Sequence, residues 1–492
     1  MSDAAEVEAI LRAALAGGAA EAEVFVKTTR GRRVVLEPAG AAGSRPRVAL
    51  ALTEERGVAV RVRDGRGRWG FAWRSPAPRE ALRGLVAEAL AAASGASARS
   101  DPDHPGEAPC AAPTDAAAPA GEPTPSASAP VGLRIHDPRV DAAPDARIVE
   151  LLEEAADAAA AVAGRSGAVD RLMLSAASSR IRLANSRGFL GEYDRSPALL
   201  SVAMAPGGPG PGAVLEERSS CVLADLDPRA CGAEAARRWL PARPAEPPLE
   251  PETVLILEPR AAASLVSALV PWVLAGGDGS LGRAPSLLQA SRGERGGLTI
   301  ADDGRLPGMV GSAPFDGVGR RTGRTVLASG GVVRGRLCAE NGNVVRPSVR
   351  EPPCVGPTNL LAEGRAGASL EDRSGTFLRA AVARFTAGPT SRLRVLRGEW
   401  CRDGEPVSAA DGLLWEGPIG RILGGVTAVG TDRRFFHLGL PIGTGSIRIE
   451  ALGPWIVEAR RPRAGAAPVR RSGALPRDAP PMVAGRPADQ GG

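Results

Sequence analysis

Apolar residues return to one face of a helix in several stretches of the chain. Near the start, Ile10, Leu11 and Leu15 lie on one helical face, and Gly17 ends the segment. A repeat of three to four positions is typical of a helix with one buried side. This pattern predicts helices over residues 3–17, 79–93, 145–164, 228–240 and 260–275.

Shorter segments rich in Val, Leu, Ile and aromatic residues predict strands. Residues 57–63 and 69–73 flank Asp64-Gly65, a dipeptide that favours a tight hairpin turn. The other predicted strands cover residues 23–27, 33–36, 48–52, 172–176, 180–185, 199–203, 253–257, 324–327, 332–337, 412–415 and 426–430.

The order of these elements predicts an α+β protein. We expect an N-terminal helix–sheet–helix domain over residues 1–95, a central α/β domain over 136–245, and a β-rich C-terminal domain of mainly antiparallel strands over 250–458. Residues 96–135, mostly Ala, Pro, Ser, Gly and Asp, are expected to be a disordered linker, and 459–492 a disordered tail.

Composition limits the function. No apolar run is long enough to span a membrane, and the acidic start lacks the pattern of a secretory signal, so we expect a cytoplasmic protein. None of the six cysteines forms a CxxC pair, which favours reduced thiols. The net charge is +6, but aromatic residues make up only 3% and Lys27 is the single lysine among arginines interspersed with acids. This composition argues against nucleic-acid binding as the main role.

Familiar catalytic motifs are absent or stand in the wrong context. Residues 277–282 match GxGxxG but follow a predicted helix rather than a strand, so a loop is the better interpretation. There is no GK[ST] and no GxSxG motif. His104, His136 and His437 are far apart in sequence and are expected to be solvated or packed, and Asp302-Asp303 is expected to be a turn.

Five short motifs occur in a fixed order. They are residues 55–62 with 69–72, residues 183–189 with 191–193, residues 314–322, Gly342-Asn343, and residues 357–360. In this order and spacing the chain resembles the TldD/PmbA family, whose paired members form a heteromeric peptidase.

The resemblance points to candidate contacts for a peptide or a partner. These are Asn185, Gly188, Phe315, Asp316, Asn343 and Asn359, all in the motifs above. We expect Phe315 to anchor its loop in the core while Asp316 faces polar partners. The alternative, which we favour for most of these motifs, is that they are turns that determine the fold, because Asn and Gly accept left-handed backbone.

The two kinds of subunit in this family differ at one helix. TldD-type subunits carry HExxxH on the helix after a short strand, and PmbA-type (TldE-type) subunits lack it. Here Ser267, Ala268 and Trp272 align with the expected His, Glu and His. Neither Ser nor Ala can replace an imidazole ligand or a general base.

The resemblance therefore implies a PmbA-type subunit with no catalytic residue and no metal or other cofactor of its own. Zinc is expected only in a TldD-like partner subunit, and the expected substrate is an unfolded peptide. Pro271 within the helix, and the absence of a glycine- and serine-rich stretch from residues 376–400, depart from the family pattern.

Two alternatives stay open. One is an independent hydrolase with a non-family site, for which His437 and Asp432 are the candidate residues. The other is a regulatory binding protein, for which the family's historical label of gyrase modulator is a loose precedent.

Overall fold

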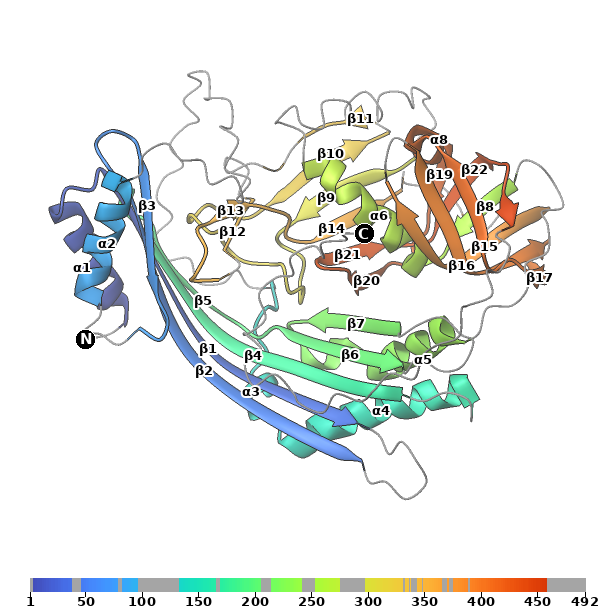
Figure 1. Cartoon of the computed structure of the whole chain (residues 1–492), viewed down its shortest axis with the longest axis horizontal. Helices are drawn as coiled ribbons and strands as arrows, with labels where there is room; N and C mark the ends of the chain where they lie inside the picture. The colour runs from blue at the N-terminus through green and yellow to red at the C-terminus, as the bar shows by residue number, and fades with distance from the viewer. Residues whose placement is uncertain are drawn as a thin grey trace, which may run out of the picture.

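The computed structural model of the chain is shown in Figure 1. The structure describes residues 3–37, 46–77, 82–95, 132–164, 169–204, 214–240, 253–274, 297–330, 332–335, 337, 343–346, 348–364, 370, 375–387 and 390–457. The expected linker residues 96–131, the loop at 277–282 and the tail at 459–492 lie outside these ranges.

Three strands of 17 residues each form the frame of the N-terminal half. They are β1 (Glu21–Glu37), β2 (Arg47–Arg63) and β4 (Val169–Asn185). β1 is antiparallel to β2 over its whole length and to β4 from Glu23 to Leu36. With β3 (Trp69–Arg74), β5 (Leu190–Arg195), β6 (Ala198–Met204) and β7 (Val214–Ser220) they form one seven-stranded sheet in the order β3-β2-β1-β4-β6-β7, with β5 paired to β4.

This sheet joins segments that the sequence assigns to separate units. β1 belongs to the first predicted segment and β4 to the second, yet they share a continuous ladder. The short strands expected at 23–27 and 33–36 are parts of one strand, because the polar residues between them also have a neighbouring strand on either side.

Helices cover the convex face of this curved sheet at both ends (Figure 1). Side chains alternate between faces along a strand, so Val24 and Val34 of β1 share a face. Val24 packs with α1 (Asp3–Ala16) and α2 (Leu82–Gly95), and Val34 packs with α4 (Asp145–Ala163) and α5 (Pro228–Trp239). Phe25, on the opposite face, contacts the C-terminal half.

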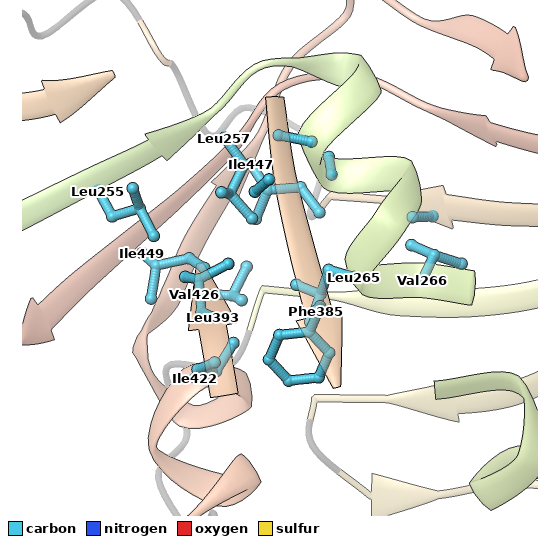
Figure 2. Packing of buried hydrophobic residues seen from close by; sticks show 14 of the residues in the cluster. Leu255, Leu257, Leu265, Val266, Phe385, Leu393, Ile422, Val426, Ile447 and Ile449 are labelled. Atoms are coloured by element: carbon cyan, nitrogen blue, oxygen red, sulfur yellow. The ribbon is translucent and has the colours of Figure 1, made fainter. Parts of the chain in front are cut away.

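The C-terminal half consists of two larger sheets with α6 (Pro259–Leu274) packed against strands of both. One sheet has the order β11-β10-β9-β14-β21-β20 and the other β19-β22-β8-β15-β16-β18-β23, with β17 paired to β16. Figure 2 shows Leu265 of α6 and Phe385 of β15 within their shared core.

The bounds of these strands are β8 Thr253–Leu257, β9 Thr299–Asp303, β10 Arg324–Ser329, β11 Val332–Val333, β14 Leu360–Glu363, β15 Thr376–Thr386, β16 Ser391–Arg402, β17 Glu405–Ala409, β18 Leu413–Gly417, β19 Val426–Val429, β20 Arg434–His437, β21 Pro441–Thr444, β22 Ile447–Leu452 and β23 Ile456–Val457. The small elements are α3 (Arg139–Ala142), a 3-10 turn (Leu223–Leu226), α8 (Ile419–Gly425), β12 (Val344–Val345) and β13 (Cys354–Val355).

The α+β class and the mainly antiparallel C-terminal half are confirmed. Among the described C-terminal strands, only β14–β21 and β15–β8 pair in parallel. The strand expected at 332–337 is assigned only at Val332–Val333, and the long strands β15 and β16 were not predicted.

Two expectations about loops were wrong. Leu133 and Ile135, at the end of the expected linker, are 5% and 2% exposed, and the Gly308 amide donates to the Leu133 carbonyl. Asp302, expected in a turn, lies in β9 and is buried. Among the described residues, no helix is long and apolar enough to cross a membrane.

The close contact between α4 and α5 leads to a testable prediction. A Cβ at Gly232 of α5 would lie 1.9 Å from the Ala155 carbonyl oxygen of α4. We expect Gly232→Ala to lower the free energy of unfolding by about 2–4 kcal/mol in urea titrations, because two helix backbones would have to separate. The control, Gly84→Ala on the exposed side of α2, should be neutral or stabilising by up to ~1 kcal/mol. Equal effects would contradict this account.

Candidate functional site

The helix that aligns with the family's zinc motif lies within the C-terminal core. α6 buries Ala262, Leu265 and Leu269 between the two sheets. Ser267 and Ala268 are half-buried, and Ala268 packs against the same core. Trp272 lies in the last turn, and its side chain is outside the described part. Hydroxyl and methyl groups at 267 and 268 do not fit a zinc ligand and a general base.

No cluster elsewhere in the described residues substitutes for this motif. Within these ranges, no group of three or more His, Cys, Asp and Glu side chains lies close enough to hold a metal ion.

Phe315 packs between its loop in the C-terminal half and the long sheet. Its ring is 3% exposed and meets Phe189 and Tyr193 edge to face, each at a centroid distance of 5.0 Å. Phe25 and Leu183 of the sheet complete this cluster together with Val349. Such aromatic pairs stabilise by roughly 0.5–1.5 kcal/mol beyond their buried area.

Asp316 and Asn185 bring two distant motifs together. The Asp316 carboxylate accepts from the backbone amides of Val318 and Arg320 at 3.0 and 2.8 Å. The Asn185 side chain accepts from the Arg187 amide at 3.0 Å and donates to the Val318 carbonyl at 3.1 Å. The polar partners of Asp316 are therefore backbone amides, two of its own loop and, at 3.4 Å, that of Val344 on β12. Burial raises the pKa of Asp316 to about 6.

Two glycines allow the turns that carry Asn185 and Asp316 to approach each other. Gly188 and Gly319 both have a φ of 89°, in the left-handed region that favours glycine. A Cβ on Gly319 would also lie 2.6 Å from the Phe189 ring. This geometry supports the interpretation of Gly188 as a residue that shapes the turn.

Asn343 and Asn359 form an internal network around Asp302. Asn343 is 1% exposed and donates to the Asp302 carboxylate at 3.0 Å. Thr358 donates to the same carboxylate through its amide at 2.7 Å and its hydroxyl at 2.9 Å. Asn359 is fully buried and donates to the Asp303 carbonyl at 2.7 Å. In this conformation neither asparagine presents a polar atom to a peptide, which favours a structural role.

His437 and Asp432 do not form the pair that an independent hydrolase was expected to use. The His437 Nδ1 lies 3.3 Å from the hydroxyl of Ser219 on β7. Burial lowers the pKa of His437, against the opposing charge of Glu217. The Asp432 carboxylate instead accepts from the amide and the hydroxyl of Ser446 at 2.8 and 2.7 Å. His136 is exposed, and His104 lies outside the described residues.

Arg346 was missed by sequence reasoning, although it joins the two halves. Its guanidinium donates to Glu23 of β1 at 2.7 Å and to the Gly317 carbonyl, and lies 5.0 Å from the Phe25 ring centre. The side chain is 4% exposed, and burial lowers its pKa to about 10. Only the tertiary fold shows that this arginine and Glu23, distant in sequence, form a pair.

Known proteins share both the domains and the fold. Models of the PmbA/TldA metallopeptidase central and C-terminal domains match residues 138–240 and 251–453. The comparison with curated proteins found no match. TldE from Thermococcus kodakarensis is similar in structure, with a TM-score of 0.68 and 17% identity over 90% of this chain and 98% of that chain.

Two further solved structures have the same fold. Both are described provisionally as modulators of DNA gyrase. The protein from Thermotoga maritima has a TM-score of 0.65 and 15% identity over 90% of this chain and 98% of that chain. The protein from Bacteroides thetaiotaomicron has a TM-score of 0.63 and 16% identity over 92% and 98%.

The two matched domains together span more than half of the chain and define a metallopeptidase-related protein. The chain belongs to the PmbA/TldD family.

Arg346 gives a test of the contact between the halves. We expect Arg346→Met to lower the free energy of unfolding by about 3–5 kcal/mol, because it leaves the Glu23 carboxylate buried without its closest cation. Arg350→Met is the matched control. Arg350 also bridges the halves, to Glu55 at 3.2 Å, but its side chain is 42% exposed, so a loss below ~1 kcal/mol is expected. Similar losses in urea unfolding would refute a special role for Arg346.

Asp302 gives a test through pH. Burial raises its pKa to about 7, above the ~3.9 of an unfolded chain. The folded state therefore holds this proton more tightly, so the contribution to stability is complete below about pH 4 and disappears as pH rises through about 7. We expect the unfolding free energy of the parent chain to fall more between pH 5 and pH 8 than that of Asp302→Asn. An unchanged slope in the variant would assign the effect to other groups, such as Asp316.

Proposed function

We propose that this chain is a non-catalytic, cytoplasmic subunit of a heteromeric zinc metallopeptidase. A TldD-like partner would supply the zinc ion and the general base, and the complex would degrade or trim unfolded peptides. The observation that carries the proposal is α6, the helix that follows the short strand β8, because it has Ser267 and Ala268 where the family resemblance places the zinc chemistry.

The packing of α6 explains how the helix can persist without that chemistry. Its apolar side contributes Leu265, Val266 and Leu269 to the largest core cluster of the described residues. Its N-terminal Arg260 pairs with Glu216 of β7 at 3.2 Å. The helix therefore stabilises the C-terminal half and its contact with the long sheet, whether or not it binds zinc.

Enclosure gives such a subunit a physical role. A peptidase site that is closed by a second chain admits only extended peptides and excludes folded proteins. A subunit that retains the fold but not the zinc ligands can provide that enclosure. This argument favours a partner of the same family, because two copies of similar architecture can form a quasi-symmetric interface.

One contact favours a second candidate function, an independent hydrolase. Ser219 and His437 lie within 3.3 Å, the kind of hydroxyl–imidazole contact from which a nucleophile can be activated. In that case His437→Ala would abolish hydrolysis by the isolated chain while its thermal unfolding stays close to that of the parent.

The decisive experiment compares the isolated chain with its complex. We expect the purified chain to hold no stoichiometric zinc by elemental mass spectrometry and to cleave no unfolded peptide. Co-expression with a TldD-like chain that carries HExxxH should give a complex with zinc and peptidase activity.

A matched control replaces the glutamate of the partner's HExxxH motif by glutamine. The complex should still assemble but lose activity, because the general base has been removed from the partner. One zinc per isolated chain together with hydrolysis by that chain would disprove the proposal.

A further inference from the structure

The concave face of the long sheet carries the single lysine of the chain. Phe25, Lys27 and Thr29 alternate with Val24 and Val26, so they lie on the face opposite α1 and α2, where Phe25 contacts the C-terminal half. In the ladder, Lys27 lies between Gly57 of β2 and Ile181 of β4. Lys27 is therefore held on a rigid central strand rather than on a loop.

Lys27 has no partner for its ammonium group among the described residues. None of them makes a hydrogen bond or an ion pair with it, although the side chain is half-buried. Burial, and next the charge of Arg195, lowers the pKa of Lys27 to about 8 against the opposing charge of Glu55. A half-buried amine that no carboxylate contacts directly is an unfavourable arrangement that a bound anion would relieve.

The next cross-strand row adds further donors. Thr29, Ser179 and Arg195 lie opposite one another on β1, β4 and β5, and the two hydroxyl oxygens are 2.9 Å apart. Arg195 donates to the Val310 carbonyl and hydrogen-bonds the side chains of Tyr193 and Cys221, but its Nε is buried without a partner. This row lies next to Lys27 on the same face.

The charges that act on Lys27 are of both signs. Arg195 repels its ammonium group, and Glu55, which lies opposite Thr29 in the next row, attracts it. Glu55 is already engaged by Arg350 at 3.2 Å and by the Ser75 hydroxyl. Lys27, Arg195 and Arg350 together therefore carry more positive charge than Glu55 offsets.

The aromatic cluster closes one end of this face. A Cβ on Gly57 would lie 2.4 Å from Val349, so the C-terminal half sits directly on the Lys27 row. On the other side of Lys27, the face continues through Thr53, Gly31 and Ala177, a row of small side chains. An extended peptide lying along that part of the sheet would have to end at Lys27.

We propose that Lys27 and Arg195, with the hydroxyl groups of Thr29 and Ser179, bind the C-terminal carboxylate of an extended peptide. The choice of a carboxylate rests on the proposed role in a peptidase, because every peptide cleavage produces a new terminal carboxylate. The closed end of the face selects the terminus, and the Lys27 ammonium group and the Nε of Arg195, neither of which has a hydrogen-bond partner among the described residues, select its charge.

The single lysine allows a direct test on the isolated chain. Reductive methylation with ¹³C-formaldehyde labels Lys27 and the α-amino group, and NMR then follows the titration of each signal. The midpoint for Lys27 should lie near 8 and rise when acetyl-trialanine with a free carboxylate is added. A rise of one unit corresponds to about tenfold tighter binding to the charged amine. Acetyl-trialanine amide should cause no shift, and the α-amino signal should not move.

Two further measurements test whether the terminal carboxylate of the peptide is the group that binds, and whether Lys27 is the residue that binds it. An amidated peptide with an internal aspartate should bind more weakly than the free acid, whereas equal binding would overturn the choice of the terminus. With a fluorescent free-acid peptide at pH 7, Lys27→Met should lose at least about tenfold in affinity and Lys27→Arg should retain most of it. Arg30→Gln, on the same strand but the opposite face and with a side chain 75% exposed, should bind like the parent.

The inference is overturned if the free acid and the amide bind equally, or if Lys27→Met binds as tightly as Arg30→Gln while both melt like the parent. Because these measurements need no partner, they fail separately from the subunit proposal. If the chain distinguishes the free acid from the amide but forms no active complex, the Lys27 site stands and the subunit proposal fails. If an active complex forms but the chain does not distinguish the two peptides, only the Lys27 site is refuted.

Discussion

The pairing of β1 with β2 on one side and β4 on the other is the constraint on which the rest of the structure depends. Because side chains alternate along β1, one face carries Val24 and Val34 toward the helices and the other carries Phe25 and Lys27 toward the C-terminal half. A slip of one residue in either ladder would exchange these faces and place Lys27 against α1 and α2. The long register, continuous over both neighbours, prevents that exchange.

The C-terminal half is held on this frame by an apolar anchor and a buried ion pair. Phe315 fills the cluster with Phe189 and Tyr193, and Arg346 joins Glu23 to the Gly317 loop. Motifs that lie far apart in sequence thereby become neighbours. This contact explains the Asn and Asp in these turns, since Asn185 and Asp316 use their side chains to fix backbone amides and carbonyls within the chain.

The proposed function rests on α6 and on the inner face of the long sheet. α6 packs in the C-terminal core, and its residues 267 and 268 offer no imidazole and no carboxylate. The same architecture leaves Lys27 unpaired among the described residues on the inner face of the sheet. Both features fit the proposed role, because a subunit that bound peptides beside a zinc-bearing partner would not need a zinc site of its own.

The sequence by itself determined the α+β class, the helices at both ends of the long sheet, and the identity of the residues on α6. Helical periodicity, turn dipeptides and the absence of His and Glu at 267, 268 and 272 are local properties, so they can be obtained from the chain alone. Tertiary structure decided that the first two segments share one sheet, that Asn343 and Asn359 are buried around Asp302, and that His437 meets Ser219 rather than Asp432. These outcomes depend on strand register and on contacts between residues far apart in sequence. A local sequence pattern carries no information about the free energies of such contacts.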